Sequence, residues 1–228
     1  MAGPRGYSRG VEIDWSKWVR HIESRRRKLA LAARPLPGTM QSIADATLAS
    51  FCLDGLNVAL ADVNAALATG VNRRVFRARQ SQRVRNHVAI IRSLDRSLAR
   101  QFPLRSEHVL RWYTSISSGL SMTHLNTAAS DRLQQVVDRM NSTELRPQAG
   151  IQQVARVHAQ LMSEPLVPSF NGILARLLLR YHLGRCGLPP VLFHSQTPVQ
   201  AMTNSNVLLP LLLELLEESY EALLKPKK

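Results

Sequence analysis

The sequence predicts an all-α protein built as a single domain. Apolar residues recur at helical spacing in almost every periodic run, no run of four to eight residues alternates as a strand does, and no internal repeat is evident. The 228 residues, 45% of them hydrophobic, are enough to bury one core. We expect this domain over 14–224, after a poorly ordered N-terminus over 1–13 and before a basic tail over 225–228.

Caps, glycines and prolines divide the first half of the chain into helices. Asp14 or Ser16 can accept hydrogen bonds from the first turn of a helix, and Ser106 can do the same further along. Proline cannot continue a helix and glycine commonly follows its last turn, so both mark helix ends. We therefore expect helices over 14–33, 40–51, 60–67, 72–100 and 106–117.

The second half continues the helical pattern after a polar loop. The stretch over 119–129 is rich in Ser, Thr and Asn, which is typical of a loop. Gly187 followed by Pro189 and Pro190 ends a helix and begins an extended segment. We expect helices over 130–140, over 150–162, from the turn near 170 to 185, and over 207–224.

The chain carries a formal net charge of +14. Nine arginines lie between Arg73 and Arg100, where Asp95 is the only acid, and a further basic cluster spans Arg25–Lys28. Such a face suits nucleic acid or another polyanion. Few aromatic residues are interleaved to stack on bases, and there is no recognised nucleic-acid-binding motif. We therefore favour a solvated arginine-rich surface and keep nucleic acid as an alternative.

Cysteine content and hydropathy predict a cytoplasmic protein without a membrane span. Cys52 and Cys186 lie far apart inside apolar helical patterns, so we expect buried free thiols in a reducing compartment. The most apolar run, Val207–Leu216, is short and contains Pro210 and Glu214. It is too short and too polar to cross a bilayer.

One polar turn carries the most specific signal for function. It runs into an apolar helix and places the free N–H groups of Phe170, Asn171 and Gly172 at the helix N-terminus, which favours an anion. Ser169 precedes them, and Arg176 points back over the same helix end one turn later. Asn171 is also a favoured cap for structural reasons alone. The turn predicts a phosphate-like anion site or a structural helix start, and it contains no general base.

These residues resemble the core motif of the Fic/Doc family, whose usual members move AMP from ATP onto protein hydroxyl groups. The family motif reads His-x-Phe-x-Asp/Glu-Gly-Asn-Gly-Arg-x-x-Arg, followed by an apolar helix that ends in Gly-x-Pro-Pro. Asn171, Gly172 and Arg176 match its Asn, second Gly and second Arg, and residues 187–190 match its end. The similarity covers roughly 14–220 and implies a Fic-like helical domain around a central loop and helix that form the anion site.

A second stretch resembles the inhibitory helix of some Fic proteins, which carries Ser/Thr-x-x-x-Glu-Gly/Asn. Ser50, Asp54 and Gly55 fit this pattern, with Asp in place of Glu. In inhibited family members the acid pairs with the last motif arginine, so the resemblance implies an ion pair between Asp54 and Arg176. Two interpretations remain open, a structural pair between helices or a pair that masks a ligand site.

The motif residues that perform the family's chemistry are absent. Pro165 stands in place of the histidine that acts as general base, and Ser169 stands in place of the magnesium-binding carboxylate. The aromatic position is Val167, the first motif glycine is Phe170, and the first motif arginine is Ile173. A lost base and a lost metal ligand each remove orders of magnitude in rate. We expect no ordinary AMP transfer, no metal site, and no ATP or Mg²⁺ as cofactor.

Two titratable residues lie just before the turn and are the catalytic candidates. His158 stands on an apolar stripe, which favours a hydrogen-bonded core histidine over a catalytic one. Glu164 replaces a position that is usually apolar in the family. It is therefore either exposed by a change in the loop or placed for chemistry.

Three hypotheses for function follow. The leading one is a degenerate, non-AMPylating Fic-fold protein that acts as a binding or regulatory module for a protein or a small anionic ligand at the Asn171–Arg176 helix end. The second is a Fic scaffold repurposed for ATP-independent chemistry on a small molecule through Glu164, His158 or Arg176. The third is association with nucleic acid through the basic face over Arg73–Arg100. A homo-oligomer is compatible with all three.

Overall fold

The described part of the chain is mainly helical. The computed structural model describes residues 13–31, 40–68, 79–117, 126–142, 146–194 and 196–225, and every regular element within them is an α-helix. The all-α prediction is therefore confirmed. The helices are α1 (Trp15–Leu31), α2 (Met40–Leu53), α3 (Leu60–Leu67), α4 (Arg79–Ala99), α5 (Ser106–Ile116), α6 (Thr127–Ser142), α7 (Pro147–Ser163), α8 (Asn171–Arg185), α9 (Val199–Thr203) and α10 (Ser205–Leu224).

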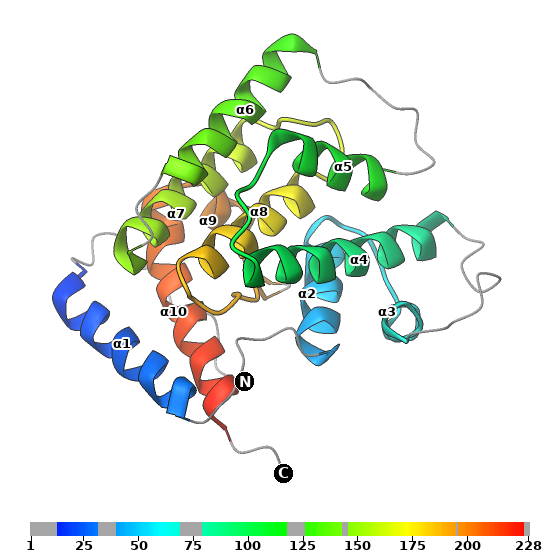
Figure 1. Ribbon diagram of the computed structural model, residues 1–228. Coiled ribbons are helices and arrows are strands. Elements are labelled where there is room, and N and C mark those ends of the chain that lie inside the picture. Colours follow the sequence, from blue (N-terminus) through cyan, green and yellow to red (C-terminus); the bar gives the residue numbers. More distant parts are fainter. Residues whose placement is uncertain are drawn as a thin grey trace.

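Helix α8 lies at the centre of the molecule, with α2, α4, α5 and α7 in contact with it (Figure 1). Its sequence is apolar on every side, as in the run Leu177–Leu179, and such a helix is stable only inside a core. All residues from Gly172 to Leu183 are buried. Arg176 and Arg180 are therefore carried into the interior, where a charged group needs a partner.

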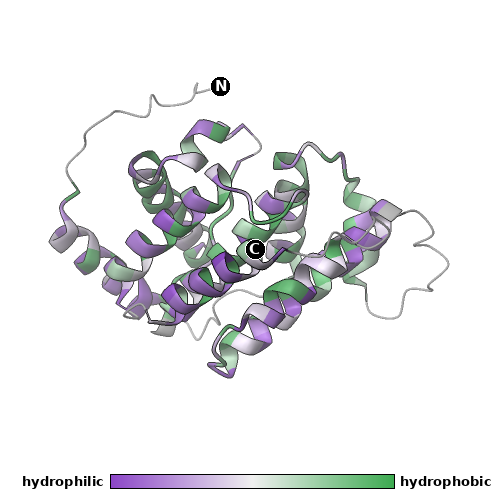
Figure 2. Ribbon diagram, turned by 90° about the horizontal axis from the view of Figure 1, so that it is seen from above, coloured by the Kyte–Doolittle hydropathy of each residue, from purple (hydrophilic) through white to green (hydrophobic). Residues whose placement is uncertain are grey.

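Two hydrophobic clusters lie on opposite sides of α8. One is formed mainly by α2 to α6 and includes Phe51 and Ile91, and the other is formed by α1, α7, α9 and α10 and includes Ile22 and Tyr220. Residues of α8 contribute to both clusters. Green hydrophobic and purple hydrophilic residues alternate around the outer helices in Figure 2, as expected for helices with one buried face.

Arg180 is paired with Asp95 of α4. Its Nη2 lies 3.1 and 3.0 Å from the two carboxylate oxygens, and its Nε donates a hydrogen bond of 3.2 Å. Burial raises the pKa of Asp95, while the charge and hydrogen bonds of Arg180 oppose this rise. The only acid among the arginines of α4 is thus turned toward the core, which leaves the outer face of that helix without one.

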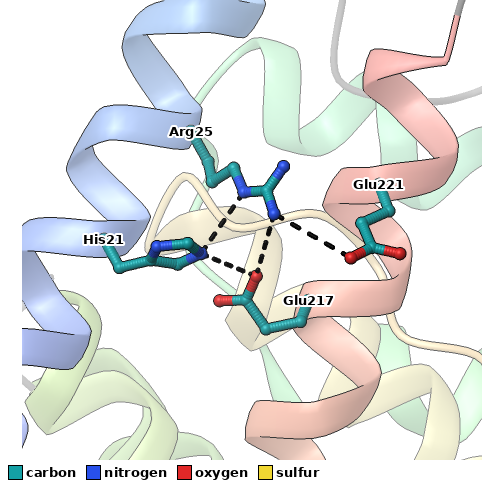
Figure 3. A network of polar contacts seen from close by, with 4 residues as sticks. All are labelled: His21, Arg25, Glu217 and Glu221. Carbon is teal, nitrogen blue, oxygen red and sulfur yellow. Dashed lines mark hydrogen bonds and ion pairs between the residues drawn. The ribbon is translucent and has the colours of Figure 1, made fainter.

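Helix α1 is attached to α10 by apolar packing and by a polar network at the surface. Trp15 and Trp18 make an edge-to-face contact with ring centroids 5.8 Å apart, and both pack against the second cluster. On the polar side, Glu217 lies 2.8 Å from the Nε2 atom of His21 and 3.7 Å from Arg25 (Figure 3). Each exposed pair of this kind contributes less than about 1 kcal/mol, so the apolar face holds α1 in place.

Several expected boundaries need correction. Arg105, with extended backbone, is the N-cap of α5, and Ser106 is the first helical residue, so the predicted Ser106 cap is wrong. The short helix α9 follows Pro198 and was not expected. The predicted helix over 72–100 is present as α4 from residue 79, while residues 1–12, 32–39, 69–78, 118–125, 143–145, 195 and 226–228 lie outside the described residues.

The two cysteines differ in exposure. Cys186 is buried as expected, and burial raises the pKa of its thiol to about 11. Cys52 is exposed, so the prediction of a buried thiol was wrong there, because it lies on the solvent side of α2. Within the described residues, no helix combines the length and the apolar character that a membrane span requires.

Candidate functional site

The N-terminus of α8 meets the turn that follows α2. Gly55 adopts φ +73°, which ends α2 and turns the preceding Asp54 toward α8. The Oδ2 atom of Asp54 accepts a hydrogen bond of 3.3 Å from the Ile173 N–H, and its Oδ1 pairs with Arg176. The predicted ion pair is present, and it places a carboxylate where the helix dipole favours an anion.

Arg176 is the most heavily engaged side chain of this site. Its Nε donates to the Ser50 hydroxyl at 2.8 Å, and its Nη2 donates to the Ser50 carbonyl at 2.7 Å and to Asp54. The residue is only 9% exposed, and its Nη1 atom is buried without a hydrogen-bond partner among the described residues. Burial lowers the pKa of the guanidinium, and the charge and hydrogen bond of Asp54 oppose that fall. The buried Nη1 amino group of this charged side chain is thus left without an acceptor among the described residues.

Gly172 permits the close approach of these charged groups. A Cβ atom at this position would overlap the Oδ1 atom of Asp54 and would lie 3.0 Å from the Nη1 atom of Arg176. Any larger residue would therefore displace the carboxylate. The absence of a side chain here is a geometric requirement for an anion to reach the first turn of α8.

Phe170, the N-cap of α8, has a left-handed backbone with φ +59°. This conformation costs a non-glycine residue about 1–2 kcal/mol. The ring lies 4.9 Å from the guanidinium of Arg83 and packs against the first cluster. Packing and the cation–π contact offset the backbone strain.

Asn171 holds the loop before α8 and does not cap the helix, so the N-cap interpretation was wrong. Its Oδ1 atom accepts a hydrogen bond of 3.0 Å from the Leu166 N–H, and its Nδ2 donates one of 2.6 Å to the Leu161 carbonyl. Both ends of its amide are therefore used within the protein. The sequence did not indicate this role because it depends on how the loop folds back.

We expect replacement of Asn171 with alanine to destabilise the protein by about 1–3 kcal/mol, because two partly buried backbone groups lose their partner. Urea unfolding followed by circular dichroism measures this change. Gln134, whose amide bonds an exposed aspartate on α6, supplies the control. An effect of Asn171→Ala no larger than that of Gln134→Ala would contradict the assigned role.

The two catalytic candidates lie in different surroundings. His158 on α7 is 1% exposed and stacks on Phe193 with ring centroids 5.5 Å apart. Burial, with a smaller contribution from the charge of Arg176, lowers its pKa to about 3. Glu164 is exposed at the end of α7, as is Pro165, and Ser169 is half-buried in the loop. A neutral core histidine and a solvated carboxylate do not form a catalytic pair.

Sequence reasoning missed His87, which shares a small cavity with the arginines of α8. The cavity has a volume of about 40 Å³, and Ser50, His87, Arg176 and Arg180 contribute its polar lining. His87 lies 3.1 Å from the Thr47 hydroxyl, and burial together with the charges of the two arginines lowers its pKa to about 3. Its place within an arginine run gave no sign of burial.

No metal-binding cluster is evident in the part of the chain that the structure describes. Groups of three or more His, Cys, Asp or Glu side chains that could hold an ion are not found there. The Asp54 carboxylate at the helix end bonds Arg176 and the Ile173 amide.

The architecture resembles that of a solved Fic protein. No protein-family model matches the sequence, and no curated protein matches it. A fragment of Fic-1 from C. elegans superposes with a TM-score of 0.71 and 17% sequence identity, over 91% of this chain and 71% of that chain. The chain therefore has the helical Fic fold.

Proposed function

We propose that this protein is a Fic-fold binding module that does not transfer AMP and that retains an anion site at the N-terminus of α8, masked by Asp54. The observation that supports this most directly is the position of the Asp54 carboxylate. This carboxylate is itself an anion. It accepts a hydrogen bond from the Ile173 N–H and forms an ion pair with Arg176. An external phosphate or carboxylate that displaced it would meet the same donors.

The unpartnered Nη1 atom of Arg176 adds to this argument. A buried guanidinium N–H without an acceptor costs free energy, and an anion with more acceptor oxygens than a single carboxylate recovers it. Phosphate and pyrophosphate fit this description. The ligand can be a small molecule or an acidic or phosphorylated group on a partner protein.

The proposal excludes AMP transfer because the side chains that perform it are replaced. Pro165 cannot accept a proton from a target hydroxyl, and Ser169 cannot neutralise Mg²⁺ as a carboxylate does. Glu164, exposed and outside the cavity beside Arg176, does not take over either role. Repurposed catalysis therefore receives no support from the arrangement of these groups.

Anion binding to Asp54→Asn and to the unmodified protein tests the proposal. We expect sodium pyrophosphate, measured by isothermal titration calorimetry, to bind the variant at least tenfold more tightly, because the competing charge is gone while the side-chain volume is kept. The additional change Arg176→Gln should abolish this gain. Equal affinity of both proteins, or no binding to either, contradicts the masked site.

The proposed absence of AMP transfer is tested by incubation with labelled ATP, Mg²⁺ and a cell extract. Neither the unmodified protein nor Asp54→Asn is expected to transfer label, since release of Asp54 restores no general base. Robust incorporation by either protein would overturn the assignment as a module without AMP transfer.

A further inference from the structure

Helices α4 and α5, which are in contact, line an open hollow with a volume of about 260 Å³. Trp112 is partly buried, with one part of its ring packed against the core, and it also lines this hollow. No Asp or Glu is among the lining residues. The polar and aromatic lining comes from Asn86, Ser93, His108, Arg111, Trp112 and Ser115.

Arg111 lines the hollow. Arg96, Arg100 and Arg105 are also exposed, on the last turn of α4 and in the segment that joins it to α5. Asp95 is turned to the opposite face of α4, where it bonds Arg180. Glu107 is then the remaining acid of these two helices, and it lies 3.6 Å from Arg111.

We propose that this α4–α5 hollow binds single-stranded nucleic acid, with one base stacked on Trp112 and the phosphates following the exposed arginines. Sequence reasoning disfavoured nucleic acid because few aromatic residues are interleaved with the arginines of α4. The fold brings the rings of Trp112 and His108 from α5 into one hollow with Arg111 and with Asn86 and Ser93 of α4. An aromatic platform within a positively charged groove is the arrangement that binds single strands.

The dimensions favour an unpaired base over a duplex. A volume of 260 Å³ is below the roughly 300–1,000 Å³ of sites that enclose a whole drug-sized ligand. It therefore suits one planar ring inserted from a longer chain. Paired bases keep their faces stacked inside the helix and cannot reach the recessed Trp112 ring. The inference is independent of the anion site at α8.

Fluorescence anisotropy with labelled oligo(dT) and oligo(U) tests the proposal on the full chain. We expect binding that weakens steeply between about 50 and 200 mM salt. Trp112→Leu should weaken it about tenfold or more, while Trp112→Phe should retain most of it. Arg96→Gln with Arg111→Gln should weaken binding and flatten its salt dependence, because phosphate contacts are lost.

Matched variants keep the test decisive. Arg20→Gln with Arg156→Gln removes the same charge from exposed positions on α1 and α7, and it should leave affinity within about threefold. The replaced arginine side chains are exposed, so their loss should leave the fold intact. These variants therefore report on binding even if Trp112→Leu does not fold. Absence of binding at 50 mM salt overturns the proposal. Equal losses in both arginine pairs, or preference for duplex over single strands, overturn it as well.

Discussion

Replacement of Asp54 with alanine is expected to lower the free energy of unfolding by about 3–5 kcal/mol. The reason is that Arg176, only 9% exposed, loses its sole carboxylate partner among the described residues and remains charged in the core. For a chain of this length, this corresponds to a fall in melting temperature on the order of 10 °C. Thermal unfolding followed by circular dichroism measures it.

The variant also separates the two interpretations of the ion pair. If the pair masks an anion site, millimolar pyrophosphate should raise the melting temperature of Asp54→Ala by more than that of the unmodified protein, since a bound ligand stabilises the folded state. A purely structural pair gives the destabilisation without this rescue. Glu107→Ala, which breaks an exposed pair with Arg111, is the control and should cost less than about 1 kcal/mol.

A second large effect is expected on acidification, because three histidines are buried in their neutral form. Burial is the main cause that lowers the pKa of His87 and His158 to about 3 and that of His182 to about 4. Nearby Arg176, Arg180 and Arg185 lower these pKa values further. The unfolded chain, with histidine pKa values near 6.5, takes up protons that the folded chain excludes.

This difference in proton uptake decides in which direction stability changes with pH. Above about pH 6.5 these histidines are neutral in both the folded and the unfolded state, so they do not change the free energy of unfolding. Below that pH the free energy of unfolding falls, and it goes on falling until the pH reaches the folded pKa values. Each of these histidines is expected to cost about 2 kcal/mol between pH 7 and pH 5. Urea unfolding at several pH values should show a steep loss of stability over this interval.

A single substitution isolates one of these contributions. His158→Phe keeps the stacking on Phe193 and removes the titratable group, so the loss of stability between pH 7 and pH 5 should shrink by about 2 kcal/mol. His194→Phe, at an exposed histidine paired with Glu218, is the comparison. If both variants have the pH dependence of the unmodified protein, His158 is not buried in its neutral form.

Much of the fold was predictable because hydrophobic periodicity and helix-breaking residues act locally. The expected helix over 60–67 matches α3 to the residue, and the all-round apolar character of 171–185 is typical of a central helix. The Asp54–Arg176 pair was implied by the motif resemblance and is present. The predicted N-cap at Ser106 was wrong by one residue, because several neighbouring positions can begin a helix at similar free energy.

The side-chain roles at the site were less predictable because they depend on tertiary contacts. Asn171 braces a loop that folds back over it, and His87 is buried by helices distant in sequence. No local pattern reports either contact. Cys52 was misassigned for the same reason, since the face of a mildly amphipathic helix that points outward is decided by its neighbours.

The sequence by itself predicted the helical class, most of the helices in their order, and the pairing of Asp54 with Arg176 at the start of α8. Those properties follow from residue identity and spacing within one segment. Only the tertiary structure decided that the Asp54 carboxylate bonds the first turn of α8, that Asp95 pairs with Arg180, and that Trp112 lines one hollow with Asn86 and Ser93 of α4. These depend on the packing of separate helices, in which burial and charge pairing are settled jointly across the whole chain.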